Sequence, residues 1–466
     1  MKKIFLLLSF TLMTSMVFAQ SENYKSAIAD FQMHYNAEKF DEIFNDFSPE
    51  MQQALPLEKA FEFFKGLKNR AGKIESYQFI DNQQETYATF KTTFEKMVLA
   101  VNFSLDNENR ISGLFIKPYE EPKAASRNTI NALQEYPEEI SELIYAKTKD
   151  LPNNTQLSIA IIKNGKTTHY GVLKVNDTLK SITNHTKVFE IGSITKVFTA
   201  TVLASLVIDK KINLTDTINA YYPFPFKDSI TLRFKELANH TSGLPRLPEN
   251  LEMSNAVNPY QNYGKTQLEA YLKNSLKISR TNRYVYSNLG AGLLGHTLGL
   301  TQHIGFRELL QKHVLDKYTM KNTFVNYQNL DDKLVQGQNP NGEPTVNWDW
   351  DVLFGAGGIL STTADLAKFA EAHFNPKDKT LALTRTPTFD INKNMKMGLG
   401  WHLVNYANGN DWIWHNGGTG GYASSITVNP TDKNAVIILS NLSAFHPKMG
   451  AVDGLCIELM QAIEKP

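Results

Sequence analysis

The chain has 466 residues, of which 42% are hydrophobic and 20% are charged, and its formal net charge is +1. This length and composition are those of a globular protein with two or three domains. The nearly balanced charge gives no electrostatic support for nucleic acid or an acidic membrane surface as the main partner.

The first twenty residues, MKKIFLLLSFTLMTSMVFAQ, begin with two lysines near the N-terminus and continue as an apolar run that reaches Ala19. This order is typical of a secretory signal peptide, so we expect residues 1–19 to be removed and the mature protein to be periplasmic or extracellular. An uncleaved membrane anchor is the alternative, although the apolar run is short for a span. No other stretch of the sequence is long and apolar enough to cross a bilayer, so we expect no transmembrane segment in the mature chain.

Cys456 is the only cysteine, which excludes an intrachain disulfide. It lies in GLCIELMQAI, a segment predicted to be a C-terminal helix, where a thiol behaves as a small buried apolar group. A single cysteine without metal-ligand spacing also argues against a zinc site, and we expect no metal.

Residues 20–120 form the first predicted domain. The segments SENYKSAIADFQMHYNAEKF and LEKAFEFFKGLKNRAG have helical periodicity, and the second is expected to end at Gly72. LAVNFSL alternates, with Leu99, Val101 and Phe103 on one face and smaller or polar residues on the other, and a turn leads to ISGLFIKPY. Helices followed by a strand meander predict a small α+β unit, which resembles the cone-shaped nuclear-transport-factor-like domains of many secreted bacterial hydrolases. We find no candidate catalytic residue in it.

Residues 121–130 are charged and contain a proline, so we expect a linker to a second domain over residues 131–466. A helix is predicted over about residues 129–149. QLSIAIIKNGKTTHYGVL then predicts two strands joined at Asn164-Gly165, a strong hairpin signal, and YASSITVNPTDKNAVIILSNL predicts another strand pair. Strand pairs at both ends of a long helical middle predict one antiparallel sheet with a helical insertion.

The segment FEIGSITKVFTA, residues 189–200, places Ser193 and Lys196 one helical turn apart. A serine hydroxyl is a weak nucleophile until a base takes its proton, and an amine at i+3 is within reach to do so. The following run, Val197 to Ile208, is apolar nearly all round, which predicts a buried helix. A lysine at its first turn must be paired or have a lowered pKa. The alternative is that Ser193 caps the helix and Lys196 extends to water.

Two further motifs accompany this pair. Y-x-N, at Tyr286 to Asn288, precedes the apolar and glycine-rich LGAGLLG. H-x-G begins at His415 and runs through Gly417 and Gly418 toward the last strand pair, where glycine lets a substrate backbone approach a strand edge. The same short patterns also occur, in other contexts, at Tyr260, Tyr327, Tyr406, His169 and His303.

S-x-x-K, then Y-x-N, then a basic residue followed by x-G on a strand is similar to the motif set of the serine β-lactamase and penicillin-binding protein superfamily. The closest resemblance is to the class C β-lactamase and D-alanyl-D-alanine carboxypeptidase/esterase branch, over about residues 130–466. The segments LANHTSGLP, GAGGILSTTADLAKF and GLGWHL fit it as well. The resemblance implies an α/β (α+β) fold, in which an antiparallel sheet flanked by helices carries an all-helical insertion.

The resemblance also implies a mechanism through an acyl-enzyme. Ser193 attacks the substrate carbonyl and is acylated, while Lys196 and Tyr286 share the proton transfers. Lys196 stabilises a transient tyrosinate, because free tyrosine is a poor base at neutral pH. Water then releases the acyl group, and no metal or organic cofactor is needed.

The remaining matched residues are implied to bind substrate. Asn288 donates to the substrate amide, and His415 and Gly417 belong to the third motif beside the pocket. The backbone N–H groups of Ser193 and Gly418 form the implied oxyanion hole. His415 stands where many β-lactamases have lysine, so its charge near neutral pH is conditional, which speaks against efficient antibiotic hydrolysis.

The sequence therefore predicts an exported serine hydrolase that acts on D-amino peptide, ester or amide substrates, peptidoglycan-type peptides among them. The second hypothesis is a penicillin-binding receptor or a non-turning binding protein of the same fold, with the N-terminal domain as its output. The complete set of Ser193, Lys196 and Tyr286 favours the enzyme, because a receptor can dispense with deacylation. Neither the substrate nor the oligomeric state follows from the sequence.

Overall fold

The computed structural model describes residues 23–83, 87–106, 108–119, 129–252, 257–279, 283–330, 332–405 and 411–465. The chain divides into two compact units, one ending at Ala125 and the other beginning at Ser126. The predicted signal peptide and most of the predicted linker lie outside the described ranges. Within those ranges, no helix has the length and apolar character to span a bilayer.

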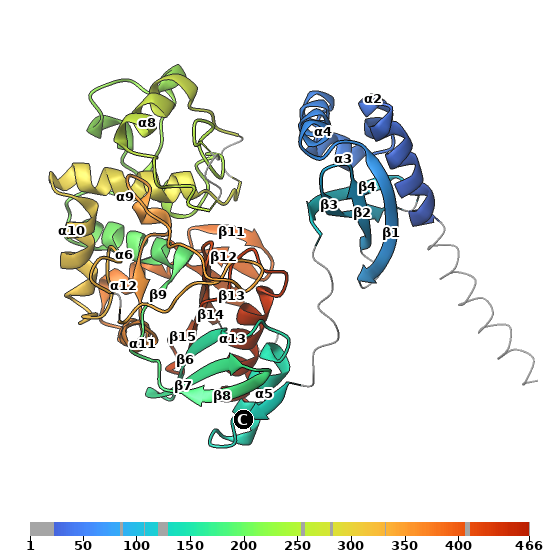
Figure 1. Cartoon of the computed structure of the whole chain (residues 1–466). Coiled ribbons are helices and arrows are strands. Elements are labelled where there is room, and N and C mark those ends of the chain that lie inside the picture. Colours follow the sequence, from blue (N-terminus) through green and yellow to red (C-terminus); the bar gives the residue numbers. More distant parts are fainter. Residues whose placement is uncertain are drawn as a thin grey trace, which may run out of the picture. The chain divides into compact units, whose positions relative to one another are not determined.

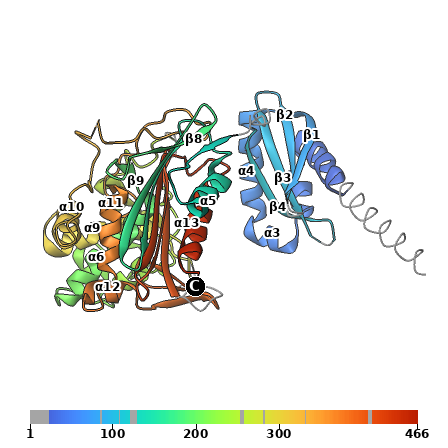
Figure 2. The same cartoon turned by 90° about the horizontal axis from the view of Figure 1, so that it is seen from below.

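The first unit is a small α+β fold (Figure 1, Figure 2). Residues 23–36 are helical, and α2 (Phe40–Asn45), α3 (Pro49–Ala54) and α4 (Leu57–Ala71) follow. An antiparallel sheet in the order β1-β2-β3-β4 comes next, formed by β1 (Ile74–Gln83), β2 (Tyr87–Phe94), β3 (Val98–Leu105) and β4 (Ile111–Pro118). Helices followed by an antiparallel meander confirm the predicted α+β unit.

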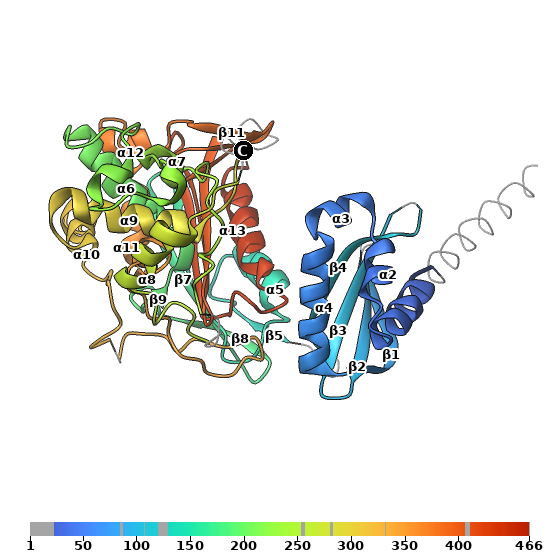
Figure 3. The same ribbon diagram turned by 90° about the horizontal axis from the view of Figure 1, so that it is seen from above.

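Helix α4 runs alongside this sheet and ends where the sequence predicts (Figure 3). Gly72 follows its last residue with φ +82°, a conformation that glycine adopts without strain. Strand β3 differs from its predicted alternation, because Ala100 and Asn102 are buried as well as the apolar face. Asn102 accepts a hydrogen bond from Thr89 Oγ1 at 2.7 Å and donates one to the Phe115 carbonyl at 2.9 Å. These partners lie on the neighbouring strands, which a single-strand pattern cannot reveal.

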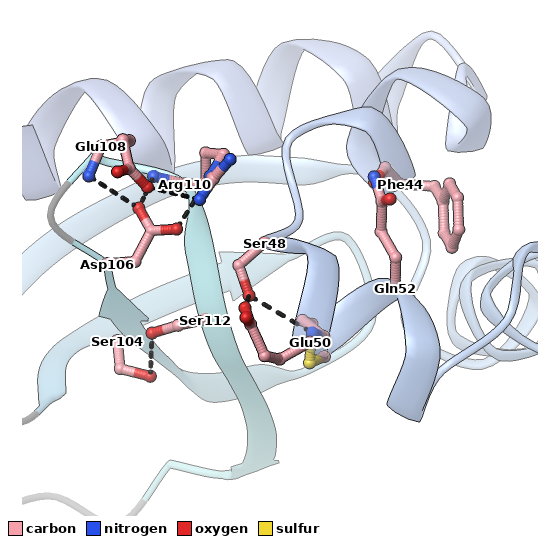
Figure 4. Close-up of polar contacts among 10 residues, drawn as sticks. Phe44, Ser48, Glu50, Gln52, Ser104, Asp106, Glu108, Arg110 and Ser112 are labelled. Atoms are coloured by element: carbon pink, nitrogen blue, oxygen red, sulfur yellow. Dashed lines mark hydrogen bonds and ion pairs between the residues drawn. The ribbon is translucent and has the colours of Figure 1, made fainter.

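Local polar contacts fix the β3–β4 turn and the start of α3 (Figure 4). The Asp106 carboxylate accepts hydrogen bonds from the backbone N–H groups of Glu108 at 3.0 Å and Arg110 at 2.8 Å, and the Arg110 side chain returns to it at 2.8 Å. Ser48 caps α3 by accepting a hydrogen bond from the Met51 N–H at 3.3 Å. Contacts of this kind stabilise a turn and a helix start from residues close in sequence.

The second unit contains a ten-stranded sheet in the order β11-β12-β13-β14-β15-β16-β6-β7-β8-β5 (Figure 1). Its neighbouring strands pair antiparallel, except β5 and β8, which are parallel. The first and last predicted strand pairs meet where β16 pairs with β6, as expected for one sheet. The strands are β5 (Ile130–Ala132), β6 (Gln156–Lys163), β7 (Lys166–Val175), β8 (Thr178–Ile182), β11 (Phe389–Asn392), β12 (Met395–Met397), β13 (His402–Asn405), β14 (Asp411–Gly418), β15 (Ala423–Asn429) and β16 (Asn434–Ser440).

The β6–β7 hairpin turns at Asn164 and Gly165, whose φ angles of 52° and 76° suit a two-residue turn. The predicted helix over residues 129–149 is wrong in its first part. Its N-terminal residues form the edge strand β5 instead, and α5 begins only at Glu138. The residue before α5 is Pro137. Because proline has no N–H to donate and disfavours a helical conformation in the residue before it, the helix does not extend further toward the N-terminus.

Helices cover both faces of this sheet (Figure 2). On one face, α5 (Glu138–Thr148) and α13 (Gly450–Ile463) enclose a core, in which Cys456 is buried as predicted and burial raises the pKa of its thiol to about 12. A second core contains residues of the helical insertion. The short strands β9 (Phe189–Glu190) and β10 (Leu360–Ser361), which pair with each other, lie at this second core. The helices of the insertion are α6 (Thr195–Ile208), α7 (Phe234–Ala238), α8 (Lys265–Ala270), α9 (Asn288–Gln302), α10 (Phe306–Leu310), α11 (Thr363–Ala372) and α12 (Lys379–Thr384).

Candidate active site

Ser193 lies between the helical layer and the sheet. The chain leaves β9, forms a short 3-10 helix over Gly192–Ile194 and continues directly into α6. Gly192 has φ +50°, and a Cβ on it would lie 2.4 Å from the backbone N of Gly418 on β14. Glycine therefore brings the half-buried Ser193 close to the end of β14, at a helix N-terminus that favours developing negative charge.

Lys196 is buried beside this serine. Lys196 is only 3% exposed. Its Nζ lies 2.9 Å from Ser193 Oγ and 2.7 Å from the Ala356 carbonyl oxygen. Burial, and after it the charge of Arg246, holds the pKa of Lys196 well below its usual value. Lys196 therefore does not extend to water, Ser193 does not cap α6, and the alternative interpretation of this pair is wrong. A neutral amine at this distance can accept the serine proton.

Tyr286 is the third member of the group. The Ser193 side chain lies close enough to lower the pKa of the Tyr286 hydroxyl, and Lys196 Nζ lies 4.9 Å from the centroid of the Tyr286 ring. Burial is the main cause that raises the pKa of Tyr286, against the opposing effects of Ser193 and of the Arg246 charge. The lowered pKa of Lys196 and the raised pKa of Tyr286 make Lys196 the better first proton acceptor and Tyr286 a proton donor.

Asn288 is the first residue of α9, directly after Ser287, which caps the helix by accepting a hydrogen bond from the Gly290 N–H at 2.8 Å. Asn288 Nδ2 donates to the Tyr260 hydroxyl at 3.0 Å. Its Oδ1 is buried and has no hydrogen-bond partner among the described residues. The sequence pattern did not select Tyr260, which reaches the site because its ring stacks on that of Trp350 with centroids 4.0 Å apart.

The third motif lies on β14. Strand alternation puts His415 and Gly417 on the same face of the sheet, whereas Asn416 faces the other way and donates to Asp453 on α13 at 2.7 Å. A Cβ on Gly417 would lie 2.0 Å from the Ile191 carbonyl oxygen and 2.9 Å from the backbone N of Ser193. Only glycine lets β14 approach the serine this closely.

His415 is a neutral acceptor in this structure. The residue is 1% exposed, and burial, together with the nearby His402 and Lys196, holds the pKa of His415 well below its usual range. Its Nδ1 lies 2.6 Å from the Asn416 carbonyl oxygen, and because a carbonyl only accepts, Nδ1 carries the proton. Nε2 is then an acceptor, and within the described ranges it has no partner.

Three residues that the sequence patterns did not single out surround this group. His240 lies with its ring centroid 4.5 Å from that of Tyr286, and His402 Nε2 lies 2.9 Å from the Tyr284 hydroxyl. Burial lowers the pKa of His402 to about 4 and that of His240 well below its usual range. The third is the exposed Arg246, whose guanidinium carbon lies 5.2 Å from the Tyr286 ring centroid.

A sequence signal existed for all three of these residues, because LANHTSGLP contains His240 and is followed directly by Arg246, and GLGWHL contains His402. Those motifs supported the resemblance but assigned no role to any of the three residues. In the part of the chain that the structure describes, no group of three or more His, Cys, Asp or Glu side chains is arranged to hold a metal ion.

The family model described as Beta-lactamase matches residues 152–454, more than half of the chain. The chain belongs to the β-lactamase family. The match covers the whole candidate site of this β-lactamase-family protein, from β9 to β14. A second model, that of a protein family of unknown function (DUF3887), matches residues 29–114, and this fits the nuclear-transport-factor-like resemblance of the first unit.

Curated relatives of this family member include a β-lactamase of Pseudomonas fluorescens, 27% identical in an alignment 347 residues long that covers 64% of this chain and 93% of the relative. Protein flp of Staphylococcus aureus strain MW2 is 28% identical in an alignment 316 residues long that covers 63% of this chain. The match spans 61% of Protein flp, less than two thirds of its length.

Solved structures share the fold of this chain. A β-lactamase/D-alanine carboxypeptidase from Pseudomonas syringae gives a TM-score of 0.59 at 22% identity and covers 70% of this chain and 100% of that one. A class C β-lactamase gives a TM-score of 0.59 at 21% identity, with 70% and 97% covered. Together with the family match, these likenesses confirm the predicted fold class and the predicted superfamily.

Proposed function

We propose that this protein is an exported serine hydrolase that forms an acyl-enzyme on Ser193 and acts on D-amino peptides, esters or amides. The observation that carries the proposal is the contact of the Ser193 hydroxyl with the Lys196 amine at 2.9 Å, with the Tyr286 ring centroid 4.9 Å from that amine. A buried amine of lowered pKa beside a serine hydroxyl is an arrangement that activates the nucleophile. Export is supported by the signal-like residues 1–19.

Acylation begins when Ser193 Oγ attacks the substrate carbonyl carbon and its proton passes to Lys196. The carbonyl oxygen becomes an anion, which the backbone N–H groups of Ser193 and Gly418 stabilise by about 3 kcal/mol for each donor. The tetrahedral adduct then breaks the bond to the leaving group, Tyr286 gives its proton to that group, and Lys196 returns a proton to Tyr286.

Deacylation repeats these transfers with water as the nucleophile. The water proton passes to the same pair, the ester bond to Ser193 breaks, and the serine oxygen regains its proton. Asn288 supports substrates that carry an amide in the acyl half. Its Nδ2 already donates to Tyr260, so in place of the donation that the resemblance implied, its Oδ1, buried and without a partner among the described residues, can accept a hydrogen bond from that amide N–H. A substrate that satisfies this oxygen removes the cost of an unpaired buried acceptor.

The test combines labelling with turnover. A fluorophosphonate probe should modify Ser193, as located by peptide mapping, and a p-nitrophenyl ester should be turned over continuously. The matched control is Ser205→Ala, because Ser205 lies further along on α6, the helix that follows Ser193, and its hydroxyl contacts a basic side chain, with His313 Nδ1 2.9 Å away. Ser193→Ala should abolish labelling and turnover, whereas Ser205→Ala should keep both. A single burst equal to the protein concentration would favour the non-turning receptor, and an adduct elsewhere would refute the proposal.

A further inference from the structure

Arg246 brings a positive charge next to Tyr286 in the candidate site. Its guanidinium carbon lies 5.2 Å from the Tyr286 ring centroid, and its charge acts on the pKa values of Lys196, Tyr260 and Tyr286. The residue is exposed, and within the ranges that the structure describes its guanidinium forms neither an ion pair nor a hydrogen bond. A guanidinium that lies over an aromatic ring keeps its N–H donors available to a ligand.

The backbone that carries this guanidinium is fixed to the second motif. The Arg246 carbonyl accepts hydrogen bonds from the N–H groups of Asn288 at 3.0 Å and Leu289 at 3.2 Å. The adjacent Pro245 carbonyl accepts one from Ser287 Oγ at 2.6 Å. Arg246 is therefore held in register with Tyr286 and Asn288, although more than thirty residues separate them in the sequence.

On the β14 side of the site, the described residues offer no second cation that could bind a substrate carboxylate. His415 presents a neutral acceptor, and Lys196 is buried with its amine directed at Ser193 and the Ala356 carbonyl. A carboxylate beside His415 would meet a lone pair, whereas a carboxylate beside Arg246 would meet a planar cation that can bind it through two parallel hydrogen bonds.

We infer that Arg246 binds a carboxylate on the acyl half of the substrate, so that the site prefers acyl groups that carry this charge. The acyl half is indicated because Arg246 is tied to Asn288, the residue proposed to face the substrate amide. The inference rests on the proposed function and adds to it a substrate class, acyl chains that end in a carboxylate.

The experiment compares three chromogenic esters on the full chain. They are p-nitrophenyl pentanoate, the mono-p-nitrophenyl ester of glutaric acid, and 3-carboxy-4-nitrophenyl pentanoate, which carries its carboxylate on the leaving group. The measured quantity is the ratio of kcat/KM for each charged ester to that for the neutral one, so that an effect of the variant on the shared chemistry cancels.

Arg246→Gln should lower the glutarate-to-pentanoate ratio by about ten- to a hundredfold, the usual range for a lost charge-assisted hydrogen bond. The ratio for the leaving-group carboxylate should change by less than about twofold. Arg246→Lys should retain part of the preference, because it keeps the charge and loses the fork geometry. Arg283→Gln is the matched control, since Arg283 is also exposed and lies three residues before Tyr286.

An unchanged glutarate ratio in Arg246→Gln, or an equal fall in Arg283→Gln, would overturn the inference while the proposed function stood. If the wild-type chain hydrolysed none of the esters, the proposed function would fail instead. The inference is then decided by a binding experiment. The affinities of butylboronic acid and 3-carboxypropylboronic acid are measured by how well each one prevents fluorophosphonate labelling of Ser193. A preference for the carboxylate that Arg246→Gln removes supports it, and equal affinities overturn it.

Discussion

Replacing Gly417 by alanine should displace Ser193 from the strand that faces it. A Cβ at this position would lie 2.0 Å from the Ile191 carbonyl oxygen, 2.6 Å from Ser424 Oγ and 2.9 Å from the backbone N of Ser193. Ordinary contact begins at 3.4 Å, so the two backbones must separate by about 1.4 Å at Ile191. A displacement of about 1 Å can cost a hundredfold in rate, and the loss of one oxyanion donor costs about 10² to 10³ in kcat. We therefore expect kcat to fall by about two to three orders of magnitude.

The assay measures kcat and KM with a p-nitrophenyl ester and Tm by thermal unfolding, with Ser193→Ala as the background. Gly450→Ala is the matched control, because Gly450 starts α13 and a Cβ there meets no other atom within 4 Å. A native-like Tm would identify the loss in Gly417→Ala as local. A kcat within about threefold of wild type would refute the oxyanion hole proposed for Ser193 and Gly418.

Three further predictions concern protons and charge. Tyr286→Phe should lower kcat by about two to four orders of magnitude with little change in Tm, because only the hydroxyl transfers the proton; an unchanged rate would exclude this role. For a neutral ester, kcat/KM should fall on the acid side as Lys196 becomes protonated, and Arg246→Gln should move this limb to higher pH, since the Arg246 charge lowers the pKa of Lys196. A shift to lower pH would contradict that reasoning. A p-nitrophenyl ester should be a better substrate than a chromogenic cephalosporin, because neutral His415 supplies no cation for the carboxylate of the antibiotic; a cephalosporin kcat/KM on the order of 10⁶ M⁻¹s⁻¹, flat from about pH 5.5 to 8.5, would show a true β-lactamase.

The contacts that depend on helical spacing were predictable from the sequence. Ser193 and Lys196 are one turn apart, so their 2.9 Å contact follows once the segment is helical. The apolar run after them had to be buried, which left the amine without water. The Asn164-Gly165 turn was equally local, because two residues at positive φ specify the hairpin.

Contacts that depend on tertiary structure were not predictable in this way. Arg246 reaches Tyr286 only because the loop after α7 is hydrogen-bonded to the start of α9. Tyr260 arrives by stacking on Trp350, and β5 exists because Ile130 and its neighbours pair with β8. None of these pairings leaves a periodic or spacing signal in the sequence, since each joins segments whose separation is set by the fold.

The buried neutral bases around Ser193 couple the proton-binding state of the site to the stability of the fold. Burial lowers the pKa values of three histidines, His240, His402 and His415. In mild acid these side chains are therefore protonated in the unfolded chain but stay neutral in the native site. Unfolding takes up protons at these three histidines in this range, so their contribution to the free energy of unfolding falls as the pH drops from about 6.5 toward about 4, the native value for His402. Lys196 adds to this coupling with the same sign and over a range that reaches alkaline pH, because its unfolded pKa is near 10.4. The burial that lowers the pKa of Lys196 therefore carries a cost in acid, because protonation of the buried groups around Ser193 favours the unfolded chain.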